Sequence, residues 1–341
     1  MQLFKVEYNV SYPKVNYIGN KEKLAEWIIN NFPVKSGKVL DLFSGGASVS
    51  FEAKKKDYIV YSNDVLYSSY VISKTLIENS SVLLDVSHID LALETEVFLE
   101  EKNKFKWLEN KLFYPEEIDE LSKLVVYSST LVGYEKYFFQ SLIRRAIIRK
   151  LPYSRMNVDW ENIKKLRDED YSYEKYGRRR AYHNESFSTH MKKNLLDYNN
   201  AIFSNGFDNK SFQLDAIDMI DNISYVDVIY MDPPYPNTMN KYDSFYGAYD
   251  LIFDKKINHI DLTNKFTFLE NIRKIIEKAV NKTNYIVLSI NSNSVPGVDE
   301  ITQLFSEYGD VNVLQRKHNY QVSGKNNKNS NNEILIVLDV R

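Results

Sequence analysis

Asp232, Pro233, Pro234 and Tyr235, within the stretch DVIYMDPPYPN, have the most specific chemistry in the chain. The apolar residues 228–230 predict the end of a buried strand, and prolines are common where strands end. A planar exocyclic amine needs two acceptors in fixed directions and a ring on which to stack. The Asp232 carboxylate and the Pro233 carbonyl can be the acceptors, because proline restricts the backbone, and Tyr235 can lie against a base. Accepting both amine hydrogens makes the nitrogen a better nucleophile.

A glycine-rich turn predicts a second ligand site. Residues 39–43 are an apolar strand, and Ser44, Gly45 and Gly46 precede a helix-compatible segment. Glycine lets the backbone approach a ligand closely. Asp64 follows the next strand, where an acid commonly binds both hydroxyls of a ribose. The pattern indicates an adenosine-type ligand, and because no GxGxxG or GxxxxGK[ST] motif is present, a cofactor without a phosphate chain fits better than NAD or ATP.

Composition excludes several classes of protein. The chain has no cysteine, which rules out disulfides and cysteine nucleophiles, and its five histidines form no HxxxH or HxH pair, so we expect no metal site. No apolar run approaches the roughly 18 residues that a membrane helix needs. The first residues have no signal-peptide pattern, so we expect a cytoplasmic protein.

The order of predicted elements indicates an α/β fold with an insertion. Strands and helices alternate in residues 1–80 and return in residues 205–341, which end in a predicted β-hairpin. Between them, residues 81–204 have the 3–4 spacing of helices. Residues 133–193 contain 15 Lys and Arg against 8 Asp and Glu, whereas the whole chain has a net charge of −2. We therefore expect a catalytic domain from the two flanks and an inserted helical domain with a basic face.

Three motifs in this order resemble those of the Dam-like, or alpha-group, DNA adenine-N6 methyltransferases. The tetrapeptide DPPY matches the hallmark of that family residue for residue. The segment NYIGNKEKL matches its aromatic-x-G-x-K motif ahead of the glycine-rich turn. The resemblance covers roughly residues 10–80 and 205–341, and implies a Rossmann-like methyltransferase fold with a mixed sheet and an inserted target-recognition domain.

The resemblance assigns roles to individual residues. It implies that the catalytic residues are Asp232, Pro233, Tyr235 and Lys21. The residues that it implies for S-adenosyl-L-methionine are Tyr17, Gly19, Lys21, Asp41, Phe43, Ser44, Gly45, Gly46, Asp64, Asp215, Ala216 and Asp232. One position departs from the family, because Ala47 stands where a second glycine is usual. Its Cβ disfavours positive φ, which weakens the expectation for that contact.

The inserted domain is expected to hold double-stranded DNA while the target adenine is extruded into the site. Arginine suits guanine edges, and both arginine and lysine suit phosphates. The candidates for DNA contact are Arg144, Arg145, Arg149, Lys150, Arg155, Arg178, Arg179 and Arg180, with Lys325 and Lys328 in the polar loop near the C-terminus. Because Arg144 and Arg145 point apart on a helix, we expect about half of the first eight to touch DNA.

The expected function is site-specific transfer of a methyl group from S-adenosyl-L-methionine to adenine N6, without a covalent enzyme intermediate. The alternatives are a cytosine-N4 methyltransferase, an RNA or protein amino-methyltransferase, and an inactive DNA-binding module. Asp232 favours adenine, since the resemblance associates serine or asparagine there with the other substrates. A cognate restriction endonuclease is one possible partner. The sequence leaves open whether the enzyme instead acts alone or comes from a phage. One active site per chain makes a monomer sufficient.

Overall fold

The computed structural model describes residues 8–236, 241–318 and 331–341, which form two compact units. The sheet unit contains Lys21–Val65, Asn205–Tyr242 and Ile257–Arg341. The helical unit contains Leu66–Ser204 and Asp243–Lys256, together with the described residues up to Asn20. The inserted domain was expected at residues 81–204. Residues 66–80 and two further segments belong to the same compact unit as these residues, and the assignment of a target-recognition domain to residues 81–204 stays a prediction.

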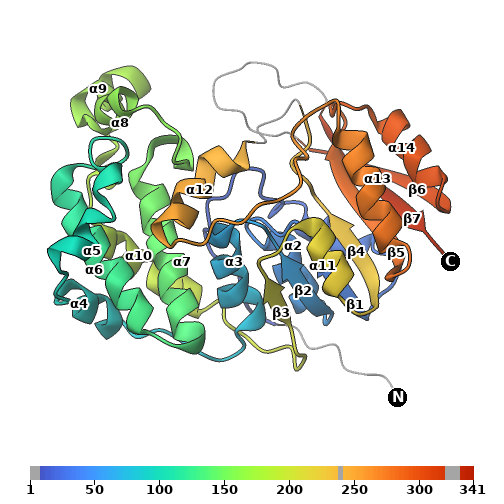
Figure 1. The fold of residues 1–341 in the computed structure, drawn as a ribbon, viewed down its shortest axis with the longest axis horizontal. Helices are drawn as coiled ribbons and strands as arrows, with labels where there is room; N and C mark the ends of the chain where they lie inside the picture. The colour runs from blue at the N-terminus through green and yellow to red at the C-terminus, as the bar shows by residue number, and fades with distance from the viewer. Residues whose placement is uncertain (1–7, 237–240, 319–330) are drawn as a thin grey trace. The chain divides into compact units, whose positions relative to one another are not determined.

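The sheet unit contains a seven-stranded mixed sheet in the order β3-β2-β1-β4-β5-β7-β6 (Figure 1). Its first five strands are parallel, and β7 is antiparallel to both β5 and β6. The strands are β1 (Lys38–Asp41), β2 (Ile59–Asn63), β3 (Lys210–Phe212), β4 (Val226–Met231), β5 (Thr283–Asn291), β6 (Asp310–Lys317) and β7 (Asn332–Asp339). The Rossmann-like fold predicted from the sequence is confirmed, including the antiparallel terminal pair.

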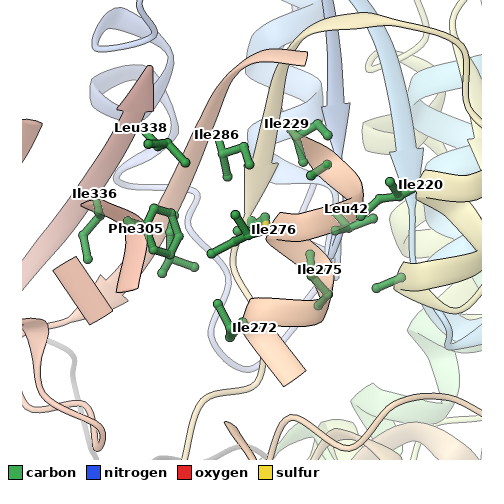
Figure 2. Packing of buried hydrophobic residues seen from close by; sticks show 14 of the residues in the cluster. Leu42, Ile220, Ile229, Ile272, Ile275, Ile276, Ile286, Phe305, Ile336 and Leu338 are labelled. Carbon is green, nitrogen blue, oxygen red and sulfur yellow. The ribbon is translucent and has the colours of Figure 1, made fainter. Parts of the chain in front are cut away.

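One face of this sheet packs on a hydrophobic core (Figure 2). Leu40, Ile229, Ile286 and Ile336 come from four adjacent strands and are fully buried there. Parallel strands buried on both faces have nearly continuous apolar sequences, as β4 and β5 do. The helices that contribute to this core are α11 (Ala216–Asn222), α13 (Phe268–Ala279) and α14 (Val298–Ser306).

The opposite face of the sheet is more polar. Side chains alternate along a strand, so Asp41, Tyr230, Ser289 and Glu333 point away from the core cluster. Phe32, just after α1 (Ala25–Asn30), meets the Tyr230 ring at a centroid distance of 6.0 Å. Helix α2 (Ser48–Lys55) packs beside α1 and against β2. This face carries the buried polar groups from which the candidate site is built.

The helical unit is arranged around α7 (Gly133–Lys150), which α3, α6 and α10 contact. Near the N-terminus of α3, the Asp250 carboxylate of α12 accepts the backbone N–H groups of Tyr67 and Ser68, at 2.9 and 3.1 Å. These bonds hold α12 within this unit. The remaining elements of the unit are α3 (Tyr67–Ser73), η1 (Lys74–Glu78), α4 (Ser87–Leu93), α5 (Leu99–Asn103), η2 (Lys106–Leu108), α6 (Pro115–Thr130), η3 (Pro152–Ser154), α8 (Trp160–Arg167), α9 (Glu169–Tyr176), η4 (Ala181–His183), α10 (Phe187–Asn199) and α12 (Tyr242–Ile252). Within the described ranges, we find no helix whose length and apolar character would let it cross a bilayer.

Candidate active site

The DPPY motif, residues 232–235, directly follows the buried strand β4. Leu42 N–H donates to the Tyr230 carbonyl at 2.9 Å, which extends the pairing of β1 and β4 to the strand end. Proline has no N–H to donate, so regular pairing stops there. The motif therefore lies at the carboxyl edge of the parallel strands, where ligands bind in open α/β sheets.

Lys21 and Asp232 form a close ion pair in the sheet unit. Lys21 Nζ lies 2.7 and 2.8 Å from the two Oδ atoms of Asp232. The side chain of Lys21 is 5% exposed and that of Asp232 is 18% exposed, so little water competes for the pair. Burial raises the pKa of Asp232 above its ordinary value, the Lys21 ammonium lowers it, and the nearby Glu333 charge raises it further. Asp232, which the sequence analysis predicted as an acceptor for an amine, thus binds an ammonium group.

Glu333 is a site residue that the sequence analysis missed. It lies near the start of β7, paired in register with Asn291, and is fully buried. Its Oε1 accepts a hydrogen bond from Ser289 Oγ and lies 3.6 Å from Lys21 Nζ. The available signal was an acid at an inward position of the apolar strand NEILIVLD.

Tyr235 packs with the hydrophobic core of the sheet unit and is 8% exposed. Burial raises the pKa of its phenol, and the backbone of Asn291 hydrogen-bonds the hydroxyl. The ring is therefore held at its hydroxyl end and by packing. Its stacking on a base stays a prediction.

The glycine-rich turn after β1 is fixed by backbone hydrogen bonds. Ser44 N–H donates to the Asn63 carbonyl at 2.8 Å, and Gly45 N–H donates to Asp64 Oδ2 at the same distance. Gly45 has a φ of +52°, and Ala47, which precedes α2, has a φ of +62°. We expected the Cβ of Ala47 to disfavour this conformation. The chain adopts it nonetheless, because the turn closes through a 2.6 Å bond from Ala47 N–H to the Ser44 carbonyl.

Asp41 ends β1 with one oxygen bonded and one free. Its Oδ2 accepts from Ser50 Oγ at 2.6 Å, whereas Oδ1 is buried and has no hydrogen-bond partner among the described residues. Burial raises the pKa of Asp41 to about 7; the Ser50 hydrogen bond lowers it, and the charges of Asp232 and Asp64 raise it. Asp41, Asp64 and Asp232 follow three adjacent parallel strands, so this edge of the sheet favours a cationic ligand.

The other predicted cofactor residues of the sheet unit have mainly structural contacts. Asp215 caps α11 through a 2.9 Å bond from Ile217 N–H to Oδ1, and its Oδ2 accepts Ile260 N–H at 2.8 Å. Ala216 belongs to the core cluster, and Phe43 packs against it. In the described part of the chain, no three histidine or carboxylate side chains are placed to hold a metal ion.

Tyr17 and Gly19 belong to the helical unit, whereas Lys21 belongs to the sheet unit. The Tyr17 ring stacks on Tyr246 with centroids 4.7 Å apart, and the backbone N–H of Ile18 donates to the Tyr246 hydroxyl at 2.8 Å. Gly19 has a φ of +80°, a conformation that favours glycine. The boundary between the two units in the sequence therefore falls within the predicted motif, after Asn20.

Three of the predicted DNA-contact residues are buried inside the helical unit, which corrects that part of the prediction. Arg144 Nη1 donates to the Val15 carbonyl at 2.8 Å, and Arg145 Nε donates to Asn194 at 2.9 Å. Lys150 Nζ pairs with a Glu117 carboxylate oxygen at 2.6 Å. At exposures of 1 to 4%, these side chains serve packing and charge pairing rather than a surface.

The other five predicted arginines are more accessible, and three of them lie over aromatic rings. Arg149 lies over Tyr182 at 3.9 Å from the ring centroid, and Arg180 lies over Tyr176 at 4.5 Å. Arg155 lies 5.5 Å from the centroids of both Tyr153 and Phe245. Arg178 and Arg179 are exposed, and Arg179 pairs with Asp170 at 3.2 Å. Lys325 and Lys328 lie outside the described residues.

Comparisons with known proteins agree with this geometry. The family model for the D12 class N6 adenine-specific DNA methyltransferase matches residues 17–322. The chain is 42% identical to the Type II methyltransferase M2.HphI of Haemophilus parahaemolyticus, over 98% of this chain and 99% of that protein.

Two more distant relatives were also found. The modification methylase StsI of Streptococcus sanguinis is 27% identical over 95% of this chain and 51% of its own length. The Type II methyltransferase M.NlaIII of Neisseria lactamica is 23% identical over 95% of this chain and 99% of its own length. Together with the family match, the near full-length identity to M2.HphI shows that the chain belongs to the D12 class of N6 adenine-specific DNA methyltransferases.

Proposed function

We propose that the methyl donor is S-adenosyl-L-methionine and that Asp232, with the Pro233 carbonyl, holds the N6 amine of a target adenine in double-stranded DNA. The observation that carries this proposal is the position of Lys21 Nζ, a nitrogen donor 2.7 and 2.8 Å from both Asp232 oxygens. A nitrogen with hydrogens to donate thus already binds the Asp232 oxygens, which supports the same contact for the target amine.

Asp232 has two tasks in this reaction. As a carboxylate it accepts a hydrogen bond from the amine, which keeps the nitrogen lone pair available for the new bond. After the N–C bond forms, the nitrogen carries one proton too many, and Asp232 is placed to take it. Burial and Glu333 raise the pKa of Asp232, so it is a stronger base than an exposed aspartate. No covalent intermediate is needed, in agreement with a chain that lacks cysteine.

The acidic edge of the sheet fits the proposed cofactor. When bound, S-adenosyl-L-methionine supplies an activated methyl group on a positively charged sulfur, together with an ammonium group. The free Oδ1 of Asp41 is a buried acceptor that a cationic donor group would satisfy. We propose that Gly45 and Gly46 allow close approach of the backbone, that Asp64 binds the ribose hydroxyls, and that Asp215 borders the adenine.

We propose that the accessible arginines of the helical unit hold the DNA. Arg149, Arg155 and Arg180 are supported from one side by aromatic rings, which limits their mobility and leaves donors for phosphates or base edges. The target nucleotide must leave the duplex, at a cost of about a few kcal/mol in lost stacking and pairing. Contacts to the phosphates on both sides offset this cost.

The names of the relatives also support a role beside a cognate restriction endonuclease that cleaves the same site. We propose that the enzyme protects host DNA in this way, as a monomer with one active site. Genomic DNA from a host that expresses the enzyme should then resist that endonuclease, and the Asp232→Asn variant should give no protection.

A direct test identifies the base. The enzyme is incubated with methyl-labelled S-adenosyl-L-methionine and random-sequence DNA, which is then digested to nucleosides. We expect the label in N6-methyldeoxyadenosine for the wild type and for Asp299→Asn, which changes an exposed acid on α14. Label in N4-methyldeoxycytidine, or no label in DNA, would contradict the proposal.

A further inference from the structure

Glu333 is a fully buried acid beside the amine-binding motif, and so far its only effect on the reaction is through the pKa of Asp232. Its carboxylate accepts from Ser289 Oγ, and its Oε1 lies 3.6 Å from Lys21 Nζ. Lys21 Nζ in turn lies within 2.8 Å of both oxygens of Asp232. One ammonium therefore lies between two carboxylates in a nearly dry part of the sheet unit.

The charges around Lys21 come from several elements. Asp232 follows β4, Glu333 is on β7, and Lys21 itself precedes α1. The Tyr230 and Tyr235 hydroxyls face the same group, and His318 lies near Lys21 on the β6 side. With both acids ionised, the three central side chains carry a net charge of −1. Lys21 therefore has a second anionic acceptor close by.

Binding of the target amine creates a problem for Lys21. The amine needs an Asp232 oxygen, and Lys21 Nζ binds both of them in this structure. Moving a buried ammonium away from a carboxylate is unfavourable unless a second carboxylate is close to it. The Glu333 carboxylate is near enough for a small side-chain shift to complete a hydrogen-bonded ion pair.

We propose that Glu333 is a positioning residue that takes the Lys21 ammonium when the target amine engages Asp232. Glu333 does not touch substrate in this proposal. It acts through Lys21, which keeps a partner in both states and leaves Asp232 free to accept the amine. The proposal rests on the proposed role of Asp232. The Ser289 hydroxyl orients the Glu333 carboxylate through its hydrogen bond, so Ser289 affects the reaction only through Glu333.

The test compares single-turnover methyl transfer from preformed complexes of enzyme, S-adenosyl-L-methionine and DNA. Glu333→Gln keeps the size of the side chain and an acceptor for Ser289, but removes the charge that would receive Lys21. We expect the transfer rate to fall about tenfold or more, with unchanged cofactor affinity. We also expect the acidic limb of the rate to move to lower pH, because the Glu333 charge raises the pKa of Asp232. Ser289→Ala should cause a smaller loss and no movement of the limb.

A double-mutant cycle tests whether Glu333 acts through Lys21. In a Lys21→Met background, Glu333→Gln should cause little further loss, because its effect is already absent. If Glu333→Gln does not fold, Glu333→Asp retains the charge but withdraws it from Lys21, and should slow transfer without moving the acidic limb. Wild-type transfer in a folded Glu333 variant, or losses that add fully to those of Lys21→Met, would overturn the proposal. The Asp232→Asn variant distinguishes the role of Glu333 from the role of Asp232. Normal transfer in that variant would refute the role of Asp232 itself.

Discussion

At the scale of single residues, burying the Asp41 carboxylate lowers the stability of the fold, and we propose that its charge is kept because it binds the cofactor. Its carboxylate is buried at the end of β1, with one oxygen bonded to Ser50 and the other without a hydrogen-bond partner in the described parts of the chain. Burial raises its pKa to about 7. A carboxylate that folding makes harder to ionise is not there for stability, because removing a charge from water costs free energy. The position is explained if the charge serves a cationic ligand.

The first prediction concerns Asp41→Asn. The folded-state pKa of Asp41 lies above its unfolded value, so the stabilisation from keeping it protonated is present at low pH and lost as the pH rises through about 7. At pH 8 the Asp41→Asn variant, whose amide stays neutral, should therefore be more stable than the wild type, by on the order of 2 kcal/mol. Denaturant unfolding at pH 5 and pH 8 measures this difference.

The same variant should bind S-adenosyl-L-methionine more weakly at pH 8, by about tenfold or more, since a hydrogen bond to a charged group is lost. The wild-type affinity should increase from pH 6 to pH 8, whereas that of Asp41→Asn should stay flat. Calorimetric titration gives both curves. Equal affinities, or a variant that is less stable than the wild type at pH 8, would contradict this account of Asp41.

At the scale of elements, the start of β1 depends on a glycine. Gly37 has a φ of +123°, and a Cβ there would lie 2.3 Å from Asp227 Oδ2. That oxygen accepts Lys38 N–H at 2.7 Å, and the Gly37 carbonyl accepts Ile59 N–H at 3.0 Å. The turn therefore sets where β1 begins relative to β2 and to the strand before the DPPY motif.

The second prediction is that Gly37→Ala destabilises the protein more than Gly206→Ala. Gly206 also has a positive φ, +78°, but a Cβ there would meet no atom of the described residues within 4 Å. Gly206→Ala should therefore cost only the backbone term of about 1 kcal/mol, whereas Gly37→Ala should cost that plus the steric clash with Asp227. Denaturant midpoints of the two variants measure the difference. Equal midpoints would show that Asp227 moves aside freely.

At the scale of elements, the sequence predicts most strands of the sheet but only part of the candidate site. Apolar runs and the residues that end them predicted β1, β2, β4 and β5 from the sequence. They did not place Glu333, because its importance comes from β7 pairing with β5, a contact between distant parts of the chain. They also misassigned Arg144 and Lys150, since charge alone does not distinguish a surface side chain from a buried pair.

At the scale of the whole molecule, the chain passes repeatedly between its two compact units. Residues up to Asn20, then Leu66–Ser204, then Asp243–Lys256 belong to the helical unit. A single insertion was the natural expectation, because only the longest of these segments has a distinctive composition. The composition of the short segment around Tyr246 does not indicate which unit it belongs to, because aromatic residues are common in the cores of both kinds of unit. Tyr17, Arg144 and Tyr246 form one stacked group within the helical unit.

The third prediction concerns DNA binding by the helical unit. Replacing Arg178, Arg179 and Arg180 together by alanine should weaken DNA binding and reduce the dependence of the binding constant on salt, by about one counterion for each lost phosphate contact. Lys150→Met should lower the melting temperature, because it breaks a buried pair with Glu117, and should leave the salt dependence unchanged. An unchanged salt slope in the triple variant would show that these arginines do not face DNA.

The central claim is that the Asp232 carboxylate holds the target amine for methyl transfer. The most direct measurement is the single-turnover rate of methyl transfer to adenine N6 by Asp232→Asn, with cofactor and DNA affinities measured in parallel. Asparagine keeps the size of the side chain and loses the charge and the base. We expect binding within about threefold of the wild type and a loss of transfer of about 100-fold or more. A variant that binds both ligands and transfers at the wild-type rate would contradict it.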